Sequence, residues 1–549
     1  MTLRNIFKKQ INNITAAAAL VAFSSLISRF LGVLRDRILA GQFGAGRSLD
    51  IYYAAFRVPD LIFNIIVLGA LSAGFIPIFT SIIKDFKCEH DIGDNENIKN
   101  SEAWDLVNNI LNFLFFALVV LSIIGIIFSP SLIRLITPGF NAEEQAWTAS
   151  LTRIMFLSPL FLGISGILGG VLQSFKRFVV YSLAPIFYNL GIIVGVLYFV
   201  QWWGLYGLAW GVVLGAVLHM AIQLPAVYQL GFRYRFKINW RDPNTRKVGR
   251  MMIPRTLSLG ITQINLVIVT VLASKLPDGS LAIFNFANNL QFFPIGIFGV
   301  SFAIAAFPVF SANAFDRDKL VDNFSQTFRK ILFFIIPATV LIIALRAQII
   351  RVVLGSGKFN WQDTILTMNT LGFFALSLFA QATIPLIIRV FYARHNSSIP
   401  FYASFITVII NTIFAIILAP RLGVTGLALA FSIANIVEFI ILWIWLSLMI
   451  GGLDINNTVK AVVKLTVSAI AAGGAAQITK ALVWPFIDMT KFSGVFVQLV
   501  AAGFIGVLVY LSFCYFLRSE ELTGFLRSLK NRRLLKKVEL GDQGEARGI

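Results

Sequence analysis

The stretch ILNFLFFALVVLSIIGIIFSPSLI at residues 110–133 contains no charged side chain and decides the structural class of the chain. An apolar helix of about 18 residues or more is long enough to cross the roughly 30 Å hydrocarbon core of a bilayer. Runs of this kind recur along all 549 residues, of which 57% are hydrophobic and only 13% are charged. One run could form a buried core helix, but the whole series indicates an all-α integral membrane protein.

The apolar runs predict about fourteen membrane-spanning helices. Their ranges are 14–40, 50–83, 104–136, 144–175, 180–202, 204–230, 247–275, 279–313, 323–353, 362–393, 398–418, 422–449, 458–483 and 492–517. The N-terminus, with Arg4, Lys8 and Lys9 before an apolar stretch, is similar to a signal peptide. Because no convincing cleavage site follows, we expect a retained first helix.

The formal net charge of +20 could suggest a nucleic acid partner. In membrane proteins, however, excess Lys and Arg collect in the cytoplasmic loops. With fourteen helices and the N-terminus inside, most basic residues fall on the cytoplasmic side, above all in the segment 231–250. We therefore expect no nucleic acid partner, and we expect a multi-pass protein of the bacterial cytoplasmic (inner) membrane with both termini in the cytoplasm.

Three sequence landmarks recur in the two halves of the chain, in the same order and at nearly the same offset. They are GALSAGFIPIF at 69–79 with VSFAIAAFPVF at 300–310, NLGIIVG from Asn189 with NTIFAII from Asn411, and YGLA at 206–209 with TGLA at 425–428. The repeat indicates two six-helix lobes, which are parallel because six is even. The predicted domains are an N-terminal lobe at 1–230, a basic cytoplasmic linker at 231–250, a C-terminal lobe at 251–449, two additional helices at 450–517 and a basic cytoplasmic tail at 518–549.

Seven arginines of the predicted helices are candidates for the membrane interior. A charge in the middle of a bilayer costs about 2.5–3.5 kcal/mol on insertion scales, so such side chains normally face a wet interior. These arginines are Arg29, Arg35, Arg37, Arg57, Arg153, Arg255 and Arg389. The first two helices hold the densest polar cluster, which consists of Ser28, Arg29, Arg35, Asp36, Arg37, Asp50, Arg57 and Asp60.

The spacing within this cluster predicts which side chains share a face. Ser28 and Arg35 are seven residues apart and lie on one helical stripe, and Arg29 and Asp36 lie on the next. Arg29 and Arg35 differ by a rotation of about 240°, so a straight helix would not aim both at one point. Gly32 between them could supply the bend, and we predict it as a hinge.

We interpret the cluster as an interior cationic pocket for phosphate groups, with Asp36 and Asp50 orienting the guanidinium groups. The planar fork of arginine binds phosphate in a bidentate way. In the alternative interpretation, Arg35, Asp36 and Arg37 lie at the outer interface and extend to water, and we place Arg37 there.

Other polar residues leave alternatives open. Arg255 follows Pro254 and could line the cavity or anchor its helix at the interface. Glu438 could be an ion or proton site or a hydrogen-bonded structural carboxyl group, and Asn411, like Asn189, could bond to a neighbouring helix. No metal-ligand spacing, nucleotide-binding loop or hydrolase motif is present, so we expect no metal, no cofactor and no enzymatic activity.

The stretch SRFLGVLRDRILAGQFGAGRSLDIYYAAFRVPDL at 28–61, followed by GALSAGFIPIF, resembles the signature of the MurJ (MviN-type) lipid II flippases. That family belongs to the superfamily of multidrug, oligosaccharidyl-lipid and polysaccharide exporters. Further matches are TPGF at 137–140, LAW at 208–210, QLP at 223–225, NLQFFPIGIFGV at 289–300, GKF at 357–359 and RVFYAR at 389–394.

The resemblance implies fourteen helices, two six-helix lobes around a central cavity, and export of the lipid-linked peptidoglycan precursor by alternating access. It implies a lipid-linked anionic substrate, contact with membrane lipids, cell-wall synthesis proteins as candidate partners, and coupling to membrane potential or a cation gradient. The family residues that carry over by position are Ser28, Arg29, Arg35, Asp36 and Asp50, with Arg57 where a lysine is common.

The chain departs from the family pattern at five positions. Phe63 and Leu68 stand where the family usually has Arg and Glu, Asn288 and Asn289 replace an Asp-Arg pair, and Phe292 replaces a Glu. Two cavity arginines are thus missing, and we infer that Arg255 replaces one of the lost charges.

This departure keeps three alternatives open. The first is a flippase for another polyprenyl-diphosphate-linked glycan. The second is a drug/cation antiporter, which the basic character of the cluster disfavours. The third is a scaffold that binds lipid-linked precursors without transporting them.

Overall fold

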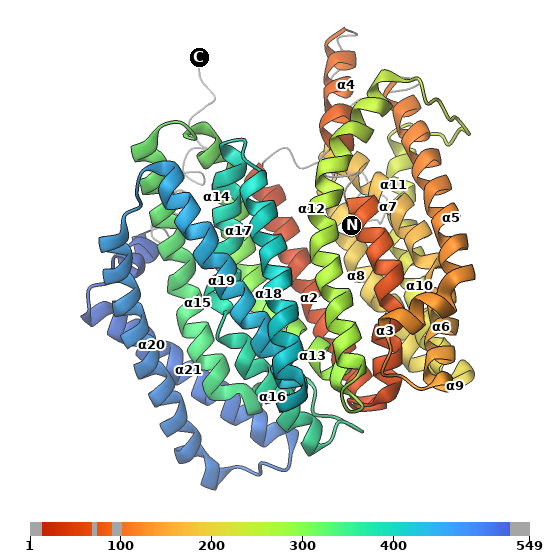
Figure 1. The fold of residues 1–549 in the computed structure, drawn as a ribbon. Helices are drawn as coiled ribbons and strands as arrows, with labels where there is room; N and C mark the ends of the chain where they lie inside the picture. Colours follow the sequence, from red (N-terminus) through yellow and green to blue (C-terminus); the bar gives the residue numbers. More distant parts are fainter. Residues whose placement is uncertain (1–13, 69–73, 90–101, 528–549) are drawn as a thin grey trace, which may run out of the picture. The chain divides into compact units, whose positions relative to one another are not determined.

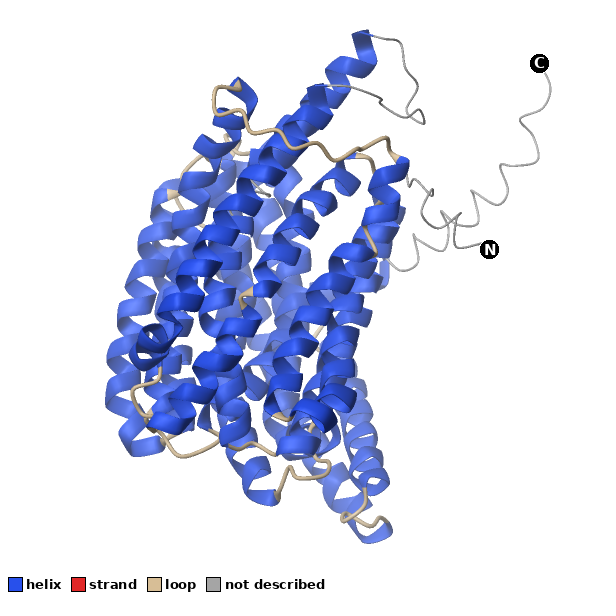
Figure 2. Cartoon of the chain, turned by 90° about the vertical axis from the view of Figure 1, so that its right-hand side faces the viewer, coloured by secondary structure: helices blue, strands red, loops and turns tan. Residues whose placement is uncertain are grey.

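The structure is a computed structural model that describes residues 14–68, 74–89 and 102–527, which form helices and loops without any β-strand (Figure 2). Some side chains within these ranges, including those of Leu68 and Arg255, lie outside the described part. The all-helical class predicted from the sequence is confirmed.

The chain divides into two compact units. Unit 1 comprises Met1–Phe286, Val353–Asp363 and Thr412–Leu427, and unit 2 comprises Ala287–Val352, Thr364–Asn411 and Ala428–Ile549. The division follows packing and cuts through five helices, so the lobe boundaries drawn from the repeat stay a prediction.

The helices of unit 1 are shown in red to green in Figure 1. They are α2 (Ile14–Phe43), α3 (Arg47–Phe63), η1 (Asn64–Leu68), α4 (Ile76–Glu89), α5 (Glu102–Ile136), α6 (Ala142–Met155), α7 (Leu157–Ser174), α8 (Phe178–Val194), η3 (Gly195–Phe199), α9 (Val200–Trp203), α10 (Leu205–Ala221), α11 (Leu224–Gln229) and α12 (Pro243–Ser274). The helices shared by both units are α13 (Ser280–Pro294), α18 (Ser398–Leu422) and α19 (Val424–Ile450). The helices of unit 2 are η4 (Ile295–Val300), α14 (Ser301–Ala312), α15 (Arg317–Val353), α16 (Trp361–Ala375), α17 (Leu378–Ala393), α20 (Ile455–Val483), η5 (Trp484–Phe486) and α21 (Phe492–Phe516), with the ends of α15 and α16 reaching into unit 1.

Ten helices within the described residues are long and apolar enough to cross a membrane, and an eleventh span arises if the bent pair α16 and α17 counts as one. The predicted spans 14–40, 50–83 and 247–275 are not among them. In the first and third, some side chains are undescribed, and the second is interrupted by the undescribed residues 69–73. The count of fourteen is therefore not confirmed, although the membrane class is.

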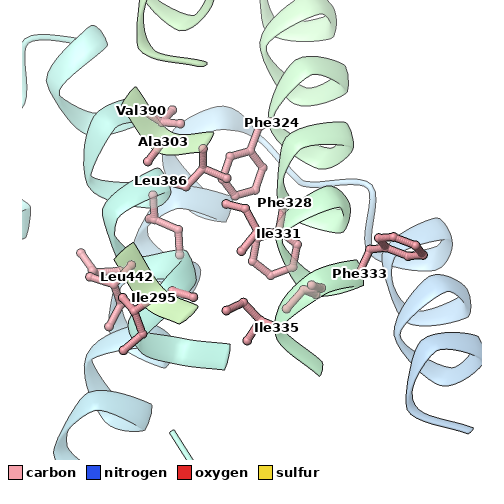
Figure 3. Close-up of a cluster of buried hydrophobic side chains, with 14 of the residues drawn as sticks. Ile295, Ala303, Phe324, Phe328, Ile331, Phe333, Ile335, Leu386, Val390 and Leu442 are labelled. Carbon is pink, nitrogen blue, oxygen red and sulfur yellow. The ribbon is translucent and has the colours of Figure 1, made fainter. Parts of the chain in front are cut away.

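The core of each unit is built from apolar side chains on facing helices. In unit 2, Phe324, Phe328 and Ile331 on α15 meet Leu386 and Val390 on α17 (Figure 3). In unit 1, the corresponding cluster joins α4, α5 and α7. Packing of this kind fixes the helix faces and therefore decides which polar side chains face one another inside each unit.

Local backbone features recur in the two halves at equivalent places. Lys176 after α7 and His395 after α17 both have a positive φ, of 58° and 57°. Gly204 before α10 and Gly423 before α19 have φ of 53° and 62°. The π-helical turns η1 and η4 each come shortly before the Pro-x-Phe of a recurring landmark, at Pro77 and Pro308. These shared irregularities agree with the internal repeat seen in the sequence.

Candidate functional site: a charged network in unit 1

Asn189 on α8 joins the two polar residues that the sequence placed on one stripe of α2. Its side-chain amide donates to Ser28 Oγ at 3.3 Å and to the Ser28 carbonyl at 3.4 Å. Its Oδ1 accepts from Arg35 Nη1 at 3.2 Å. Ser28 and Arg35 thus lie on the same face of α2, as predicted, and this face packs against Asn189 of α8.

Arg35 is held on its other side by the adjacent carboxylate. Asp36 Oδ1 accepts from Arg35 Nε at 3.0 Å and from Nη2 at 2.8 Å, and Asp36 is only 4% exposed. A guanidinium has five N–H donors. The three hydrogen bonds to Asp36 and Asn189 leave two donors on a side chain that keeps 22% of its surface open. Arg35 is therefore oriented in advance and retains capacity for an external acceptor.

Arg57 on α3 is bonded only to neutral acceptors among the hydrogen bonds that the structure shows for it. Its Nε donates to Thr270 Oγ1 on α12 at 2.9 Å, and its Nη2 donates to Asn285 Oδ1 on α13 at 2.9 Å. Asp60, one turn further along α3, is close enough for an electrostatic interaction without a direct ion pair. The positive charge of Arg57 is thus only partly offset.

Tyr53, four residues before Arg57 on α3, is a polar residue that the sequence analysis missed. Its ring packs edge-on against Tyr52 and Phe286, and its hydroxyl group is buried without a hydrogen-bond partner. Its position next to the cluster in the sequence could have flagged it, but tyrosine in a helix carries no specific signal.

Asp50 does not orient a guanidinium group of this network. Its Oδ2 accepts from the Gly279 amide at 2.7 Å and its Oδ1 from the Ala282 amide at 2.9 Å, so it caps the start of α13 from a distant helix. Arg47 lies 3.7 Å away and also pairs with Glu144 and Asp278. At 1% exposure, Asp50 has the geometry of a structural carboxylate.

Arg37 lies against a segment from later in the chain. Its Nη1 donates to the Val353 carbonyl at 3.4 Å, and its own carbonyl accepts from Ser356 Oγ at 3.3 Å. The amide of Lys358 donates to the Gly41 carbonyl at 2.8 Å. This end of α2 is therefore fixed to residues 353–358, and Arg37 faces away from the Asn189 side.

Arg29 and Arg255, which were also predicted to bind the substrate, are described in less detail by the structure. Arg29 is half-buried on α2, and the backbone of Arg255 lies in α12 while its side chain is outside the described residues. Both assignments stay predictions.

Gly32 lies within the unbroken helix α2, and a methyl group at its Cα would meet Asn189 Oδ1 at 3.9 Å, an ordinary contact. The Gly32→Ala substitution therefore has room in this structure. If Gly32 acts as a hinge during transport, the alanine variant should reach normal levels in the membrane but lose several-fold in transport rate, because alanine stiffens a helix. Transport in proteoliposomes measures the effect. Equal rates for both proteins would remove the hinge assignment.

The two polar residues predicted in the second half belong to unit 2. Glu438 on α19 is 8% exposed and accepts from Ser404 Oγ on α18 at 2.8 Å. Asn411, one turn beyond Thr407 on α18, is 1% exposed. Of the two alternatives left open for Glu438, the contacts favour a hydrogen-bonded structural carboxyl group.

Where the resemblance implied charged residues in α13, the structure shows a neutral chain of hydrogen bonds. Asn288 accepts from Gln291, whose Oε1 accepts from Gln381 on α17 at 3.0 Å. Gln381 also donates to Ser377 Oγ at 2.8 Å, and Ser377 donates to Ser432 on α19 at 2.9 Å. Gln291 and Ser377 are fully buried. Amide and hydroxyl groups thus satisfy one another here without a net charge.

Within the described part of the chain, no group of three or more His, Cys, Asp or Glu side chains is arranged to hold a metal ion. The charged network consists of arginines, carboxylates and amides, which suits an anion better than a metal.

Comparisons with known proteins agree on one family. The profile of the family described as "Lipid II flippase MurJ" matches residues 39–496. A probable lipid II flippase MurJ of Buchnera aphidicola subsp. Acyrthosiphon pisum is 30% identical over 431 residues, covering 77% of this chain and 81% of the relative. The protein of the same name from Bdellovibrio bacteriovorus is 26% identical over 528 residues, covering 95% of this chain and 98% of the relative.

Solved structures agree on the fold. A structure described as lipid II flippase MurJ in an inward closed conformation has a TM-score of 0.72 at 24% identity, covering 91% of this chain and 99% of that one. An inward-facing multidrug resistance MATE family transporter of the MOP superfamily has a TM-score of 0.65 at 17% identity, covering 77% of this chain and 94% of that one. At these identities the structures show a shared transporter fold.

Proposed function

Because the chain belongs to the MurJ family of lipid II flippases, we propose that it moves lipid II from the cytoplasmic to the outer leaflet of the bacterial inner membrane. The observation that carries this proposal is the pre-oriented guanidinium of Arg35, which has two unused donors on a partly open surface. A lipid-linked diphosphate offers the oxygen acceptors that such a fork binds best.

Arg35 and Arg57 would both contact the substrate. Arg57 contributes charge that its neutral partners Thr270 and Asn285 do not cancel, and Tyr53 contributes an unused hydroxyl group. Arg29, with Ser28 and Asp36 behind it on α2, would extend this surface. The polyprenyl tail would stay in the bilayer, since burying it against charges would be unfavourable.

Arg255 is a further proposed contact. The neutral chain at Asn288 and Gln291 supplies no cation where the family pattern has one, so the substrate phosphates need another donor. Arg255 on α12 belongs to the same helix as Thr270, the partner of Arg57. A charge-assisted hydrogen bond contributes about 1.5–3 kcal/mol, enough to compensate for one lost arginine.

Transport would proceed by alternating access, with two helical lobes moving around a central cavity that holds the diphosphate. Membrane potential or a cation gradient would drive the cycle. Both termini would lie in the cytoplasm, because the basic segments then fall on the inner side.

Complementation tests the function directly. Expression of this chain should restore growth and cell shape in bacteria depleted of their own lipid II flippase, and lipid II should become accessible to an external probe. The transport proposal fails if the protein reaches the membrane at normal levels but lipid II stays inside. Rescue of cells that lack a flippase for a different polyprenyl-diphosphate-linked glycan would instead identify another substrate.

A further inference from the structure

A ladder of asparagines on α5 holds the segment between α11 and α12. Asn108 accepts from the Arg235 amide at 2.9 Å and donates to the Arg233 carbonyl at 3.2 Å. Asn112 donates to the carbonyls of Arg235 and Lys237, at 3.1 and 3.0 Å. These two asparagines are at most 3% exposed. Residues 232–242, which we name the basic strap, are thus fixed along the side of a helix.

The register of these bonds shows that the strap is extended from Arg233 to Lys237. Asn108 and Asn112 are separated by one helical turn, a rise of about 6 Å, and two residues of an extended chain span about 6.6 Å. The backbone groups of every second residue can therefore meet successive asparagines, as observed. After Lys237 the chain turns back along α5, since the Asn239 amide donates to Asn109 at 2.6 Å.

The side chains of the strap alternate in character. Basic residues occupy positions 233, 235 and 237, while Tyr234, Phe236, Ile238 and Trp240 occupy the positions between them. In an extended chain, successive side chains point to opposite sides. Phe236 is 79% exposed and Trp240 is 66% exposed, far more than such large rings normally are in water. The strap therefore has exposed basic side chains on one side and exposed aromatic side chains on the other.

The strap lies where the apolar part of a membrane helix begins. Asp105 is the last charged residue of α5 before a run that is free of charge up to Arg134, and Asn108 and Asn112 lie at the start of that run. Trp240 packs edge-on against Phe113 of the same run. Tryptophan and tyrosine collect at this depth, at the boundary between headgroups and hydrocarbon.

Four cations surround one hollow at the end of the strap. A pocket of about 250 Å³ is lined by Arg241, Pro243, Arg246, Lys247 and Arg250. Arg246 donates to the Trp240 carbonyl at 3.0 Å, which links the basic pocket to the strap. The nearby acids are engaged, since Asp242 caps α12 through Thr245 and Asp105 pairs with Lys237 at 2.8 Å.

We propose that the basic pocket and the strap bind the headgroup of an anionic phospholipid of the surrounding bilayer. The phosphate lies among Arg241, Lys247 and Arg250, and Trp240 and Phe236 insert beside the acyl chains. Clustered basic residues next to a membrane helix attract anionic lipids, and the asparagine ladder holds these residues at the depth where headgroups lie. The inference rests on the membrane class of the chain and is independent of the substrate that it transports.

The test compares two double variants in which the same charge is removed. Lys247→Gln with Arg250→Gln removes two of the four charges of the basic pocket, both at exposed positions, and Lys319→Gln with Lys330→Gln removes the charges of two exposed lysines on α15. Full-length protein is reconstituted in phosphatidylcholine vesicles that contain a minority of brominated phosphatidylglycerol. Quenching of the Trp240 fluorescence, obtained by difference from a Trp240→Phe protein, reports the bound lipid.

The preference of the pocket variant for phosphatidylglycerol over phosphatidylcholine should fall roughly tenfold, because each basic group near the surface raises the affinity for an anionic lipid severalfold. The α15 variant should keep the wild-type preference. Added salt should weaken the wild-type preference. The proposal is overturned if both double variants lose the same share of the lipid preference or if the wild type shows no preference. It is also overturned if soluble glycerol phosphate displaces phosphatidylglycerol as well as the lipid itself does. Unchanged thermal unfolding of the variants in detergent excludes a folding defect.

Discussion

Replacing Arg35 by glutamine should abolish the rescue of flippase-depleted cells while leaving the protein in the membrane. Glutamine retains a donor toward Asn189 but removes the charge and the bidentate fork, so the diphosphate loses charge-assisted hydrogen bonds of about 1.5–3 kcal/mol. Lipid II affinity should fall by roughly ten- to a hundredfold. Binding to purified protein, measured together with complementation, separates a loss of affinity from a loss of protein.

Arg37→Gln is the matched control on the same helix. Arg37 points to the Val353 carbonyl rather than to Asn189, so its neutral variant should support growth at near wild-type levels. Arg35→Lys should be intermediate, because it keeps the charge but loses the planar fork. Equal loss in Arg35→Gln and Arg37→Gln would mean that the cluster is structural and that its role in binding is wrong.

The helical period was enough to predict which side chains of α2 share a face. The seven-residue spacing of Ser28 and Arg35 predicted a common face, and the structure shows both side chains on Asn189. The sequence also predicted that Asn189 bonds to a neighbouring helix, but not to which one. A hydrogen bond across 154 residues depends on how α8 packs beside α2, and no local pattern encodes that packing.

The partners of α3 could not be predicted for the same reason. Thr270 and Asn285, which accept from Arg57, lie more than 200 residues later in the chain, and nothing in their local sequence distinguishes them from other polar residues of membrane helices. Glu438 shows the opposite case. Its isolation in an apolar helix correctly marked it as unusual, but only Ser404 on the facing helix tells a bonded carboxyl group from an ion site.

Asp50 was grouped with the arginines because it is acidic and close to them in sequence, whereas its contacts place it at the start of α13. Asp50→Asn should therefore lower stability and membrane levels instead of substrate affinity. The amide of asparagine can accept from only one of the two backbone N–H groups, Gly279 or Ala282, and turns a donor toward the other. An unsatisfied buried donor costs about 1–3 kcal/mol. The thermal unfolding midpoint in detergent should fall clearly, while the remaining folded protein binds lipid II normally.

Gly279 makes this interpretation sharper. Its φ of 85° and its crowding by the Ala45 carbonyl leave no room for a side chain, so the loop before α13 can present its amide to Asp50 only in this conformation. Gly279→Ala should therefore reproduce the instability of Asp50→Asn. The double variant should lose less stability than the sum of the two single losses, because both changes break the same contact. Asp36→Asn provides the contrast, since Asp36 holds Arg35 and its loss should weaken substrate binding. Normal stability with weakened lipid II binding in Asp50→Asn would instead return Asp50 to the substrate site, because a carboxylate that only caps a helix cannot affect affinity without first affecting the fold.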